Sequence, residues 1–207
     1  PFALFLSWGP PHDPYGTAPP QYKERVPEPE KLRLRPNVPE SKQQEARQML
    51  AGYYAHIAAM DDCIGWIVQT LRESGIEDDT IFVFTSDHGD MLQSHGYTHK
   101  QKPWDESIRV PFLLRYPAKF GRRARTVAAP INTPDIMPTV LSLSGIEVPA
   151  TCEGRDFSAL IGGAAASEDE AALLMLPVPF HQWGYRNGGR EYRGIRTVRY
   201  TYVRDLK

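Results

Sequence analysis

The sequence predicts an α/β domain followed by a small β-rich unit. Apolar and aromatic residues recur three or four positions apart between residues 53 and 71, which is the spacing of an amphipathic helix. A β-branched and aromatic run, TIFVFTS at residues 80–86, follows after one short turn, and this succession is typical of an α/β sheet. The stretch YRGIRTVRYTYVRD at residues 192–205 alternates instead like an antiparallel strand pair.

The long helix has recognisable ends. Ser41 is the expected N-cap, since serine side chains accept hydrogen bonds from the first turn of a helix. Ser74 and Gly75 fit the other end, because glycine adopts the left-handed conformation that closes many helices. We therefore expect one helix between these positions, and the strand over residues 80–86 after it.

Two further strands are expected on either side of this helix and strand. FALFLSW at residues 2–8 is an apolar run that suits a strand buried on both faces. RVPFLLRYP at residues 109–117 is a second strand bounded by prolines. Residues 17–40, which precede the long helix, are rich in proline and in charged residues, and we expect a long loop there.

The segment NTPDIMPTVLSLSGI predicts a second, shorter helix. Thr133 can cap it, Pro134 suits the first helical position, and Asp135 complements the helix dipole. An alanine-rich, acidic stretch at residues 162–172 then predicts a linker, so a domain boundary is expected near residue 165.

Composition excludes several classes of partner. The formal charge is −1 and the isoelectric point is about 6.7, so nothing favours a nucleic acid or a membrane surface. No apolar run approaches the roughly 20 residues that span a bilayer. Cys63 and Cys152 have no spacing typical of zinc or redox sites, which leaves both a cytoplasmic and a periplasmic compartment open.

Ligand-type side chains gather in FTSDHGDMLQSHGYTHKQKPWDES, residues 84–107. Ligands of open α/β sheets bind beyond the carboxyl ends of the strands, where Asp87 and His88 would lie. A carboxylate oxygen and an imidazole nitrogen can reach one divalent ion from a tight turn, and Gly89 lets the backbone turn away. The same three residues also suit an ordinary Asx turn, so both interpretations stay open at this stage.

Other polar residues of the chain are assigned to the scaffold. Asp61 and Asp62 are neighbours on a helix and point about 100° apart, so they do not form a carboxylate pair. Asp61 is expected to be buried beside the apolar stripe and Asp62 to be solvated. Supporting roles are expected for His95, His99, Asp90, Glu106, Ser107 and Arg109.

Five segments carry a resemblance to a known family: FLSWGPPHDPY, YYAHIAAMDDCIGWIVQTLRESGIEDDTIFVFTSDHGDMLQSHG, KQKPWDESIRVPFLLRYP, NTPDIMPTVLSLSGIEVPATCEGRDFSALI and YRGIRTVRYTYVRD. In this order they resemble the sulfatase family, within the alkaline-phosphatase-like superfamily. The resemblance implies part of an alkaline-phosphatase-like mixed sheet flanked by helices, followed by a small antiparallel β-rich unit. Residues 1–165 would be the C-terminal part of the catalytic α/β domain, and residues 166–207 the incomplete start of the C-terminal subdomain.

The resemblance also implies roles for four residues. Asp87 and His88 match family positions that bind a calcium ion. His12 in PPHDP matches a histidine that contacts the sulfate ester, and Lys100 matches a lysine directed at the sulfate, with Lys102 as the alternative. Cations there would neutralise charge on the sulfate oxygens in the transition state, so His12 and Lys100 are expected both to bind substrate and to act in catalysis. Without the family, His12 reads equally well as an exposed loop histidine and Lys100 as a solvated lysine.

The family's nucleophile is expected outside this chain. Sulfatases use a formylglycine made from Cys or Ser in a Cys/Ser-x-Pro/Ala-x-Arg motif, and neither Cys63 nor Cys152 stands in one. In the family that motif lies N-terminal to the segment matching PFALFL. We therefore expect a sulfuric ester hydrolase as the parent protein, an inactive isolated chain, and a missing N-terminal segment or partner chain that covers its apolar edges. Two ligands cannot hold calcium tightly, because calcium takes six to eight oxygens.

Two alternatives remain at the level of sequence. One is a phosphoesterase or phosphonate monoester hydrolase of the same superfamily, which shares SDHG and the anion clamp. The other is a noncatalytic, degenerate paralogue kept for binding or assembly. The sulfated substrate is open as well, since a carbohydrate sulfate and a small aryl or alkyl sulfate fit equally.

Overall fold

The computed structural model describes residues 1–165, 170–177 and 191–206. It divides the chain into two compact units. The first contains residues 1–78 and 85–111, and the second contains residues 79–84 and 112–207. The predicted boundary near residue 165 stays a prediction, because residues 166–169 lie outside the described part.

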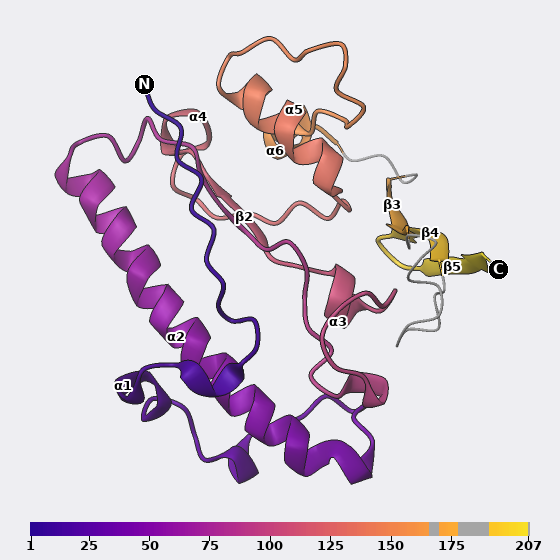
Figure 1. Ribbon diagram of the computed structural model, residues 1–207. Helices are drawn as coiled ribbons and strands as arrows, with labels where there is room; N and C mark the ends of the chain where they lie inside the picture. Colours follow the sequence, from indigo (N-terminus) through magenta and orange to yellow (C-terminus); the bar gives the residue numbers. More distant parts are fainter. Residues whose placement is uncertain (166–169, 178–190, 207) are drawn as a thin grey trace. The chain divides into compact units, whose positions relative to one another are not determined.

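The first unit is built on one long helix, α2 (Gln43–Glu73). The N-terminal loop packs along it, with Ala18, Tyr22 and Ala55 as the buried centre of the contact. Figure 1 shows the short helix α1 beside α2. The remaining elements of this unit are η1 (Tyr15–Thr17), α1 (Pro20–Lys23), η2 (Pro29–Lys31), η3 (Glu40–Lys42), η4 (Ser94–Gly96) and α3 (Asp105–Ile108).

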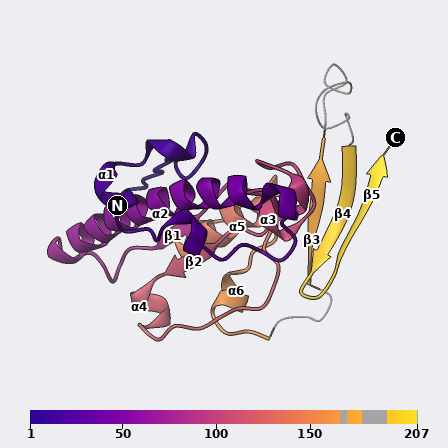
Figure 2. The same cartoon turned by 90° about the horizontal axis from the view of Figure 1, so that it is seen from below.

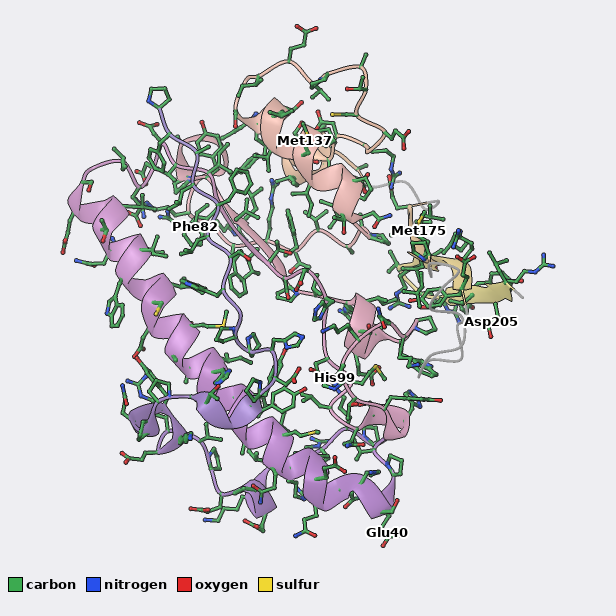
Figure 3. All side chains as sticks on the ribbon, in the orientation of Figure 1. Glu40, Phe82, His99, Met137, Met175 and Asp205 are labelled. Atoms are coloured by element: carbon green, nitrogen blue, oxygen red, sulfur yellow. The ribbon has the colours of Figure 1, made fainter. Side chains whose placement is uncertain are left out.

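The predicted end of the long helix is confirmed and its predicted start is wrong. Gly75 follows α2 with φ of 68°, the left-handed conformation expected of a closing glycine. Ser41 lies inside η3, and the residue that precedes α2 is Lys42, whose side chain makes no capping hydrogen bond. The chain enters α2 directly from this 3-10 turn, shown near Glu40 in Figure 3, so the extended backbone that an N-cap needs is absent.

The second unit holds two small sheets. β1 (Phe82–Thr85) pairs with β2 (Phe112–Arg115), and β3 (Ala171–Leu176), β4 (Glu191–Thr197) and β5 (Thr201–Leu206) form an antiparallel sheet. Figure 2 shows these three strands side by side. The helices of this unit are α4 (Pro117–Phe120), α5 (Thr133–Leu143) and α6 (Ser158–Ile161).

The strands predicted over residues 80–86, 109–117 and 192–205 are confirmed as β1, β2 and the β4–β5 pair. β3 was missed, because its alanines lower strand propensity; pairing with β4, for example Leu173 opposite Ile195, places it in the sheet. The strand predicted over residues 2–8 is not present. A strand needs a hydrogen-bonded neighbour, and no described strand pairs with this segment, whose Phe5 is 96% exposed.

The helix α5 begins one residue earlier than predicted. Asn132 is the N-cap: its Oδ1 accepts from the N–H of Thr133 at 2.9 Å, and Asp135 Oδ2 accepts from the N–H of Asn132 at 2.8 Å. Asp135 also accepts from the N–H of Arg155 at 2.8 Å, so this buried carboxylate ties the following loop to the helix. Asparagine is the stronger cap by intrinsic preference, which explains why it takes the place predicted for threonine.

Candidate functional site

The turn after β1 presents Asp87 and His88. The Ser86 hydroxyl donates to the carbonyl of His88 at 2.8 Å, and the N–H of His88 donates to Asp87 Oδ1 at 2.9 Å. The N–H of Gly89 donates to the carbonyl of Ser107 at 2.8 Å. A Cβ atom on Gly89 would lie 2.0 Å from the carbonyl oxygen of Glu106, so only glycine lets these two segments approach this closely. The turn predicted from SDHG is therefore present.

Asp87 and His88 lie close enough to share a cation. Their Oδ2 and Nε2 atoms are 3.5 Å apart, and the Asp87 side chain is 83% exposed. His88 Nδ1 lies 2.8 Å from the carbonyl oxygen of Gly89, which can only accept, so Nδ1 carries a proton, and in the neutral ring Nε2 then keeps its lone pair. A carboxylate oxygen and an unprotonated imidazole nitrogen are both suitable ligands of a divalent cation.

This donor pair fits part of a calcium site and not a whole one. Calcium takes six to eight ligands, mostly oxygens. Within residues 1–165, 170–177 and 191–206, no three His, Cys, Asp or Glu side chains gather where one metal ion could be held. Asp87 and His88 could hold calcium only together with further ligands.

His12 and Lys100, 88 residues apart in sequence, meet in the structure. Lys100 Nζ contacts His12 Nε2 directly. His12 Nδ1 hydrogen-bonds the carbonyl oxygen of Asp13 at 3.0 Å and lies 2.8 Å from Asp13 Oδ1; because both oxygens can only accept, Nδ1 carries a proton and Nε2 accepts from the lysine ammonium. The rings of His12 and His88 stand edge to face with their centroids 5.8 Å apart. The structure thus brings the predicted anion-binding residues next to one of the two predicted metal ligands.

A buried hydrogen bond joins the His12 loop to the turn after β1. Tyr15 OH donates to Asp90 Oδ2 at 2.6 Å, and Asp90 Oδ1 accepts from the N–H of Leu92 at 3.0 Å. Burial and the neighbouring carboxylate of Asp90 raise the pKa of the Tyr15 hydroxyl, which keeps it a donor. Gly52 of α2 allows this packing, because a Cβ there would lie 2.3 Å from the carbonyl oxygen of Tyr15.

The backbone of residues 91–99 folds back on itself. The N–H of Met91 donates to the carbonyl of His99 at 2.7 Å, and the N–H of Gln93 donates to the carbonyl of Tyr97 at 2.8 Å. Met91 is fully buried, so this loop is anchored from its inner side. The His99 side chain is half exposed, and its Nδ1 is 3.3 Å from Asp13 Oδ1.

His95 and Glu106, for which supporting roles are predicted, share Asn37 as a hydrogen-bonding neighbour. Asn37 Nδ2 donates to Glu106 Oε1 at 2.7 Å and lies 3.0 Å from His95 Nε2. The ring of His95 stacks on Trp104 at 4.6 Å. Burial opposes ionisation of Glu106, but hydrogen bonds such as that from Asn37 outweigh it and hold the pKa of the carboxyl below its usual value.

Lys100, and not the alternative Lys102, is the lysine that contacts His12. Lys102 Nζ lies 4.6 Å from the ring centroid of Tyr97.

The expectation for the aspartate pair on α2 is reversed. Asp61 is exposed, and the partly buried Asp62 pairs with Arg25 at 3.0 Å. Arg25 belongs to the N-terminal loop, so the side chain of Asp62 lies on the side of α2 that this loop covers.

Sequence reasoning missed Asp13, Tyr15 and Asn37. Asp13 stands directly after His12, and a carboxylate beside a candidate histidine is a signal that could have been used. Tyr15 and Asn37 act through partners more than 50 residues away, Asp90 and His95, so no local pattern announces them.

Comparisons with known proteins identify relatives of this chain. A family model described as Sulfatase matches residues 1–146, and one described as N-sulphoglucosamine sulphohydrolase, C-terminal, matches residues 93–206. The whole chain is 45% identical to the Ulvan-active sulfatase of Formosa agariphila and covers 40% of it. An Endo-4-O-sulfatase of Bacteroides thetaiotaomicron is 30% identical over 97% of the chain, which covers 41% of that relative.

Solved structures show the same fold. A Bacteroides fragilis protein, yidJ, superposes with a TM-score of 0.82 at 31% identity, over 96% of this chain and 43% of its own. The phosphonate monoester hydrolase SpPMH of Silicibacter pomeroyi superposes with a TM-score of 0.65 at 26% identity, over 89% of this chain and 38% of its own. The chain therefore spans about two-fifths of the length of each of these four proteins.

Proposed function

From the chain's membership of the sulfatase family, we propose that the complete gene product hydrolyses sulfate esters and that this chain supplies its sulfate clamp and part of a calcium site. The observation that carries the proposal is the meeting of His12, Lys100 and His88 from two distant segments. Three nitrogen-bearing side chains beside one exposed carboxylate, Asp87, suit a metal-bound anion better than they suit a solvated loop.

Lys100 and His12 would bind the sulfate oxygens. The Lys100 ammonium donates hydrogen bonds and brings a positive charge to the place where negative charge develops during S–O cleavage. His12 Nε2 now accepts from Lys100; with a sulfate ester bound, a protonated Nε2 would donate to the ester oxygen. When the S–O bond breaks, that proton would pass to the leaving alcohol oxygen. Asp13 keeps the other ring nitrogen occupied throughout.

Asp87 and His88 would contribute two ligands to calcium. The ion, when bound, would neutralise charge on the sulfate group. The remaining ligands, like the formylglycine nucleophile, belong in this proposal to parts of the gene product outside the 207 residues, or to water and substrate. The isolated chain is accordingly proposed to be inactive and to bind calcium weakly, with a dissociation constant above about 1 μM, because it offers too few oxygens.

A carbohydrate sulfate is the proposed substrate class. The choice is supported by the names of two relatives that align over nearly the whole chain, an ulvan-active sulfatase and an endo-4-O-sulfatase; an arylsulfatase is also among the relatives, over 54% of the chain. The likeness to a phosphonate monoester hydrolase keeps that reaction as the second candidate, since a phosphonate monoester is also a tetrahedral monoanion.

The test compares sulfate and phosphonate esters side by side. The complete gene product is assayed by ion chromatography for sulfate released from a sulfated oligosaccharide and from an aryl sulfate, and for phosphonate released from a matched phenyl ester. We expect the oligosaccharide to have the highest kcat/KM and activity to fall when calcium is chelated. A higher kcat/KM for the phosphonate ester would overturn the sulfatase assignment. Sulfate release by the 207-residue chain alone would overturn its proposed inactivity.

A further inference from the structure

One carboxylate oxygen faces two imidazole rings beside the proposed clamp. Asp13 Oδ1 lies 2.8 Å from Nδ1 of His12 and 3.3 Å from Nδ1 of His99. These two histidines come from segments 87 residues apart, and His99 directly precedes Lys100. The Asp13 carboxylate is therefore the shared partner of both segments that build the clamp.

The contact determines which nitrogen of His12 faces the anion site. A neutral imidazole has one N–H donor and one acceptor nitrogen. Asp13 presents acceptor atoms to Nδ1, from its carboxylate and from its carbonyl oxygen at 3.0 Å, so the proton resides on Nδ1. Nε2 is then the acceptor that meets the Lys100 ammonium. Carboxylates that hold a functional histidine by its second nitrogen set both the tautomer and the ring orientation.

The same carboxylate restrains the loop that carries Lys100. His99 and Gln101 flank this lysine and both have positive φ, 61° and 69°. Side-chain-bearing residues adopt this region at an energetic cost, so the surroundings must hold the backbone there. The carbonyl of His99 accepts from the N–H of buried Met91 at 2.7 Å, and the ring of His99 faces Asp13 Oδ1, 3.3 Å from its Nδ1.

We propose that Asp13 is a positioning residue of the sulfate clamp, which aligns His12 by its Nδ1 and Lys100 through His99. This inference rests on the proposed function, because it assigns a role within the same site. Asp13 acts through the two histidines and does not itself contact the sulfate, since a carboxylate would repel that anion.

Asp13→Asn tests the proposal, because asparagine keeps the size of the side chain and loses its charge. Its amide can also donate to Nδ1, which favours the neutral His12 tautomer with the proton on Nε2, and it lacks the negative charge that would support the ring protonated on both nitrogens when Nε2 donates to the sulfate ester. The matched control is Asp61→Asn, at an exposed position on α2. Two readouts are taken on the complete gene product: the ¹⁵N shifts of the His12 ring near pH 8, assigned with a His12→Gln variant, and kcat and KM for the sulfate ester.

The expected result has two parts. The wild-type His12 ring shows a protonated Nδ1, and Asp13→Asn moves it towards a tautomer mixture. The same change lowers kcat about 10- to 100-fold, the usual effect of removing the outer partner of a functional histidine. The Asp61→Asn control keeps the His12 shifts and stays within about twofold of the wild-type kcat, since substitutions away from such contacts have small effects. Asp13→Glu, which keeps the charge, recovers part of the lost kcat.

The following outcomes would contradict the positioning role of Asp13 or the proposed function. Unchanged His12 shifts in Asp13→Asn, or changed shifts with unchanged kcat, overturn the positioning role. A kcat of Asp13→Glu no higher than that of Asp13→Asn also overturns it. If the wild-type protein hydrolyses no sulfate ester, the proposed function fails, and the His12 shifts alone then support or overturn the alignment by Asp13.

Discussion

Replacing Gly89 with alanine perturbs the candidate site where its two backbone segments come closest. The added Cβ would stand 2.0 Å from the carbonyl oxygen of Glu106, and real Cβ atoms essentially never approach closer than 3.0 Å. One segment must therefore move by about 1 Å relative to the other. The position of the Cβ is fixed by its own backbone and the atom that it meets is a backbone oxygen, so no side-chain rotation can relieve the clash.

The expected loss of stability follows from the hydrogen bond that this movement breaks and from the overpacking that it leaves. The hydrogen bond from the N–H of Gly89 to the carbonyl of Ser107 is 2.8 Å long, and opening it by about 1 Å exceeds hydrogen-bonding distance. Its loss costs about 1 kcal/mol, and the overpacking costs a further 1 to 3 kcal/mol or so. We expect Gly89→Ala to lower the free energy of unfolding by about 2–4 kcal/mol. The shift also displaces His88 from His12, so turnover of the remaining folded protein should fall as well.

The assay is a urea titration followed by circular dichroism, with Gly65→Ala as the matched control. Gly65 lies inside α2 with no heavy atom within 4 Å of an added Cβ. Alanine there should stabilise the helix by about 0.5–1 kcal/mol, so the same substitution is expected to act in opposite directions at the two sites. An unfolding free energy of Gly89→Ala within about 0.5 kcal/mol of wild type, the usual range of neutral substitutions, would refute the reasoning.

Three further outcomes are expected from buried polar groups. Tyr15→Phe leaves Asp90 Oδ2 without its donor and should lower the urea-unfolding free energy by about 1–3 kcal/mol; an unchanged midpoint would show that the bond is not needed. Asn37→Ala removes a hydrogen bond that holds the pKa of Glu106 low, so the Glu106 carboxyl should titrate at higher pH by NMR, and an unmoved titration would contradict that cause. Burial, aided by the charge of Lys23, lowers the pKa of His56, so the unfolded state binds this proton more tightly. The contribution of His56 to the free energy of unfolding is therefore fully present above about pH 6.5 and is lost as the pH falls below that value. In His56→Gln, the urea midpoint should fall less steeply over the same pH range.

Helices and strands whose sequence pattern lies within a short stretch of the chain were predicted correctly. The periodicity of α2, the closing Gly75 and the apolar runs of β1 and β2 are each contained in short windows of sequence. Elements that depend on distant partners were predicted less well. Residues 2–8 have the composition of a strand but no described strand beside them, whereas β3 lacks the composition and forms because β4 pairs with it.

The candidate site divides in the same way. The turn at Asp87 and His88 follows from the position of SDHG after a strand. The contact of Lys100 with His12 could not be derived from spacing, since it depends on the left-handed backbone at His99 and Gln101 and on the fold of the N-terminal loop. The resemblance to sulfatases pointed to both residues, and the structure adds Asp13, whose carboxylate lies beside His12 and His99.

The most direct test of the central claim is a crystal structure of the complete gene product with calcium and a slowly hydrolysed sulfate ester. The account predicts that Lys100 Nζ and His12 Nε2 separate and that each lies within about 3 Å of a sulfate oxygen, the length of a charge-assisted hydrogen bond. It predicts that Asp87 and His88 would be among the ligands of the calcium ion. A sulfate bound elsewhere, with the contact between Lys100 and His12 intact, would contradict the account.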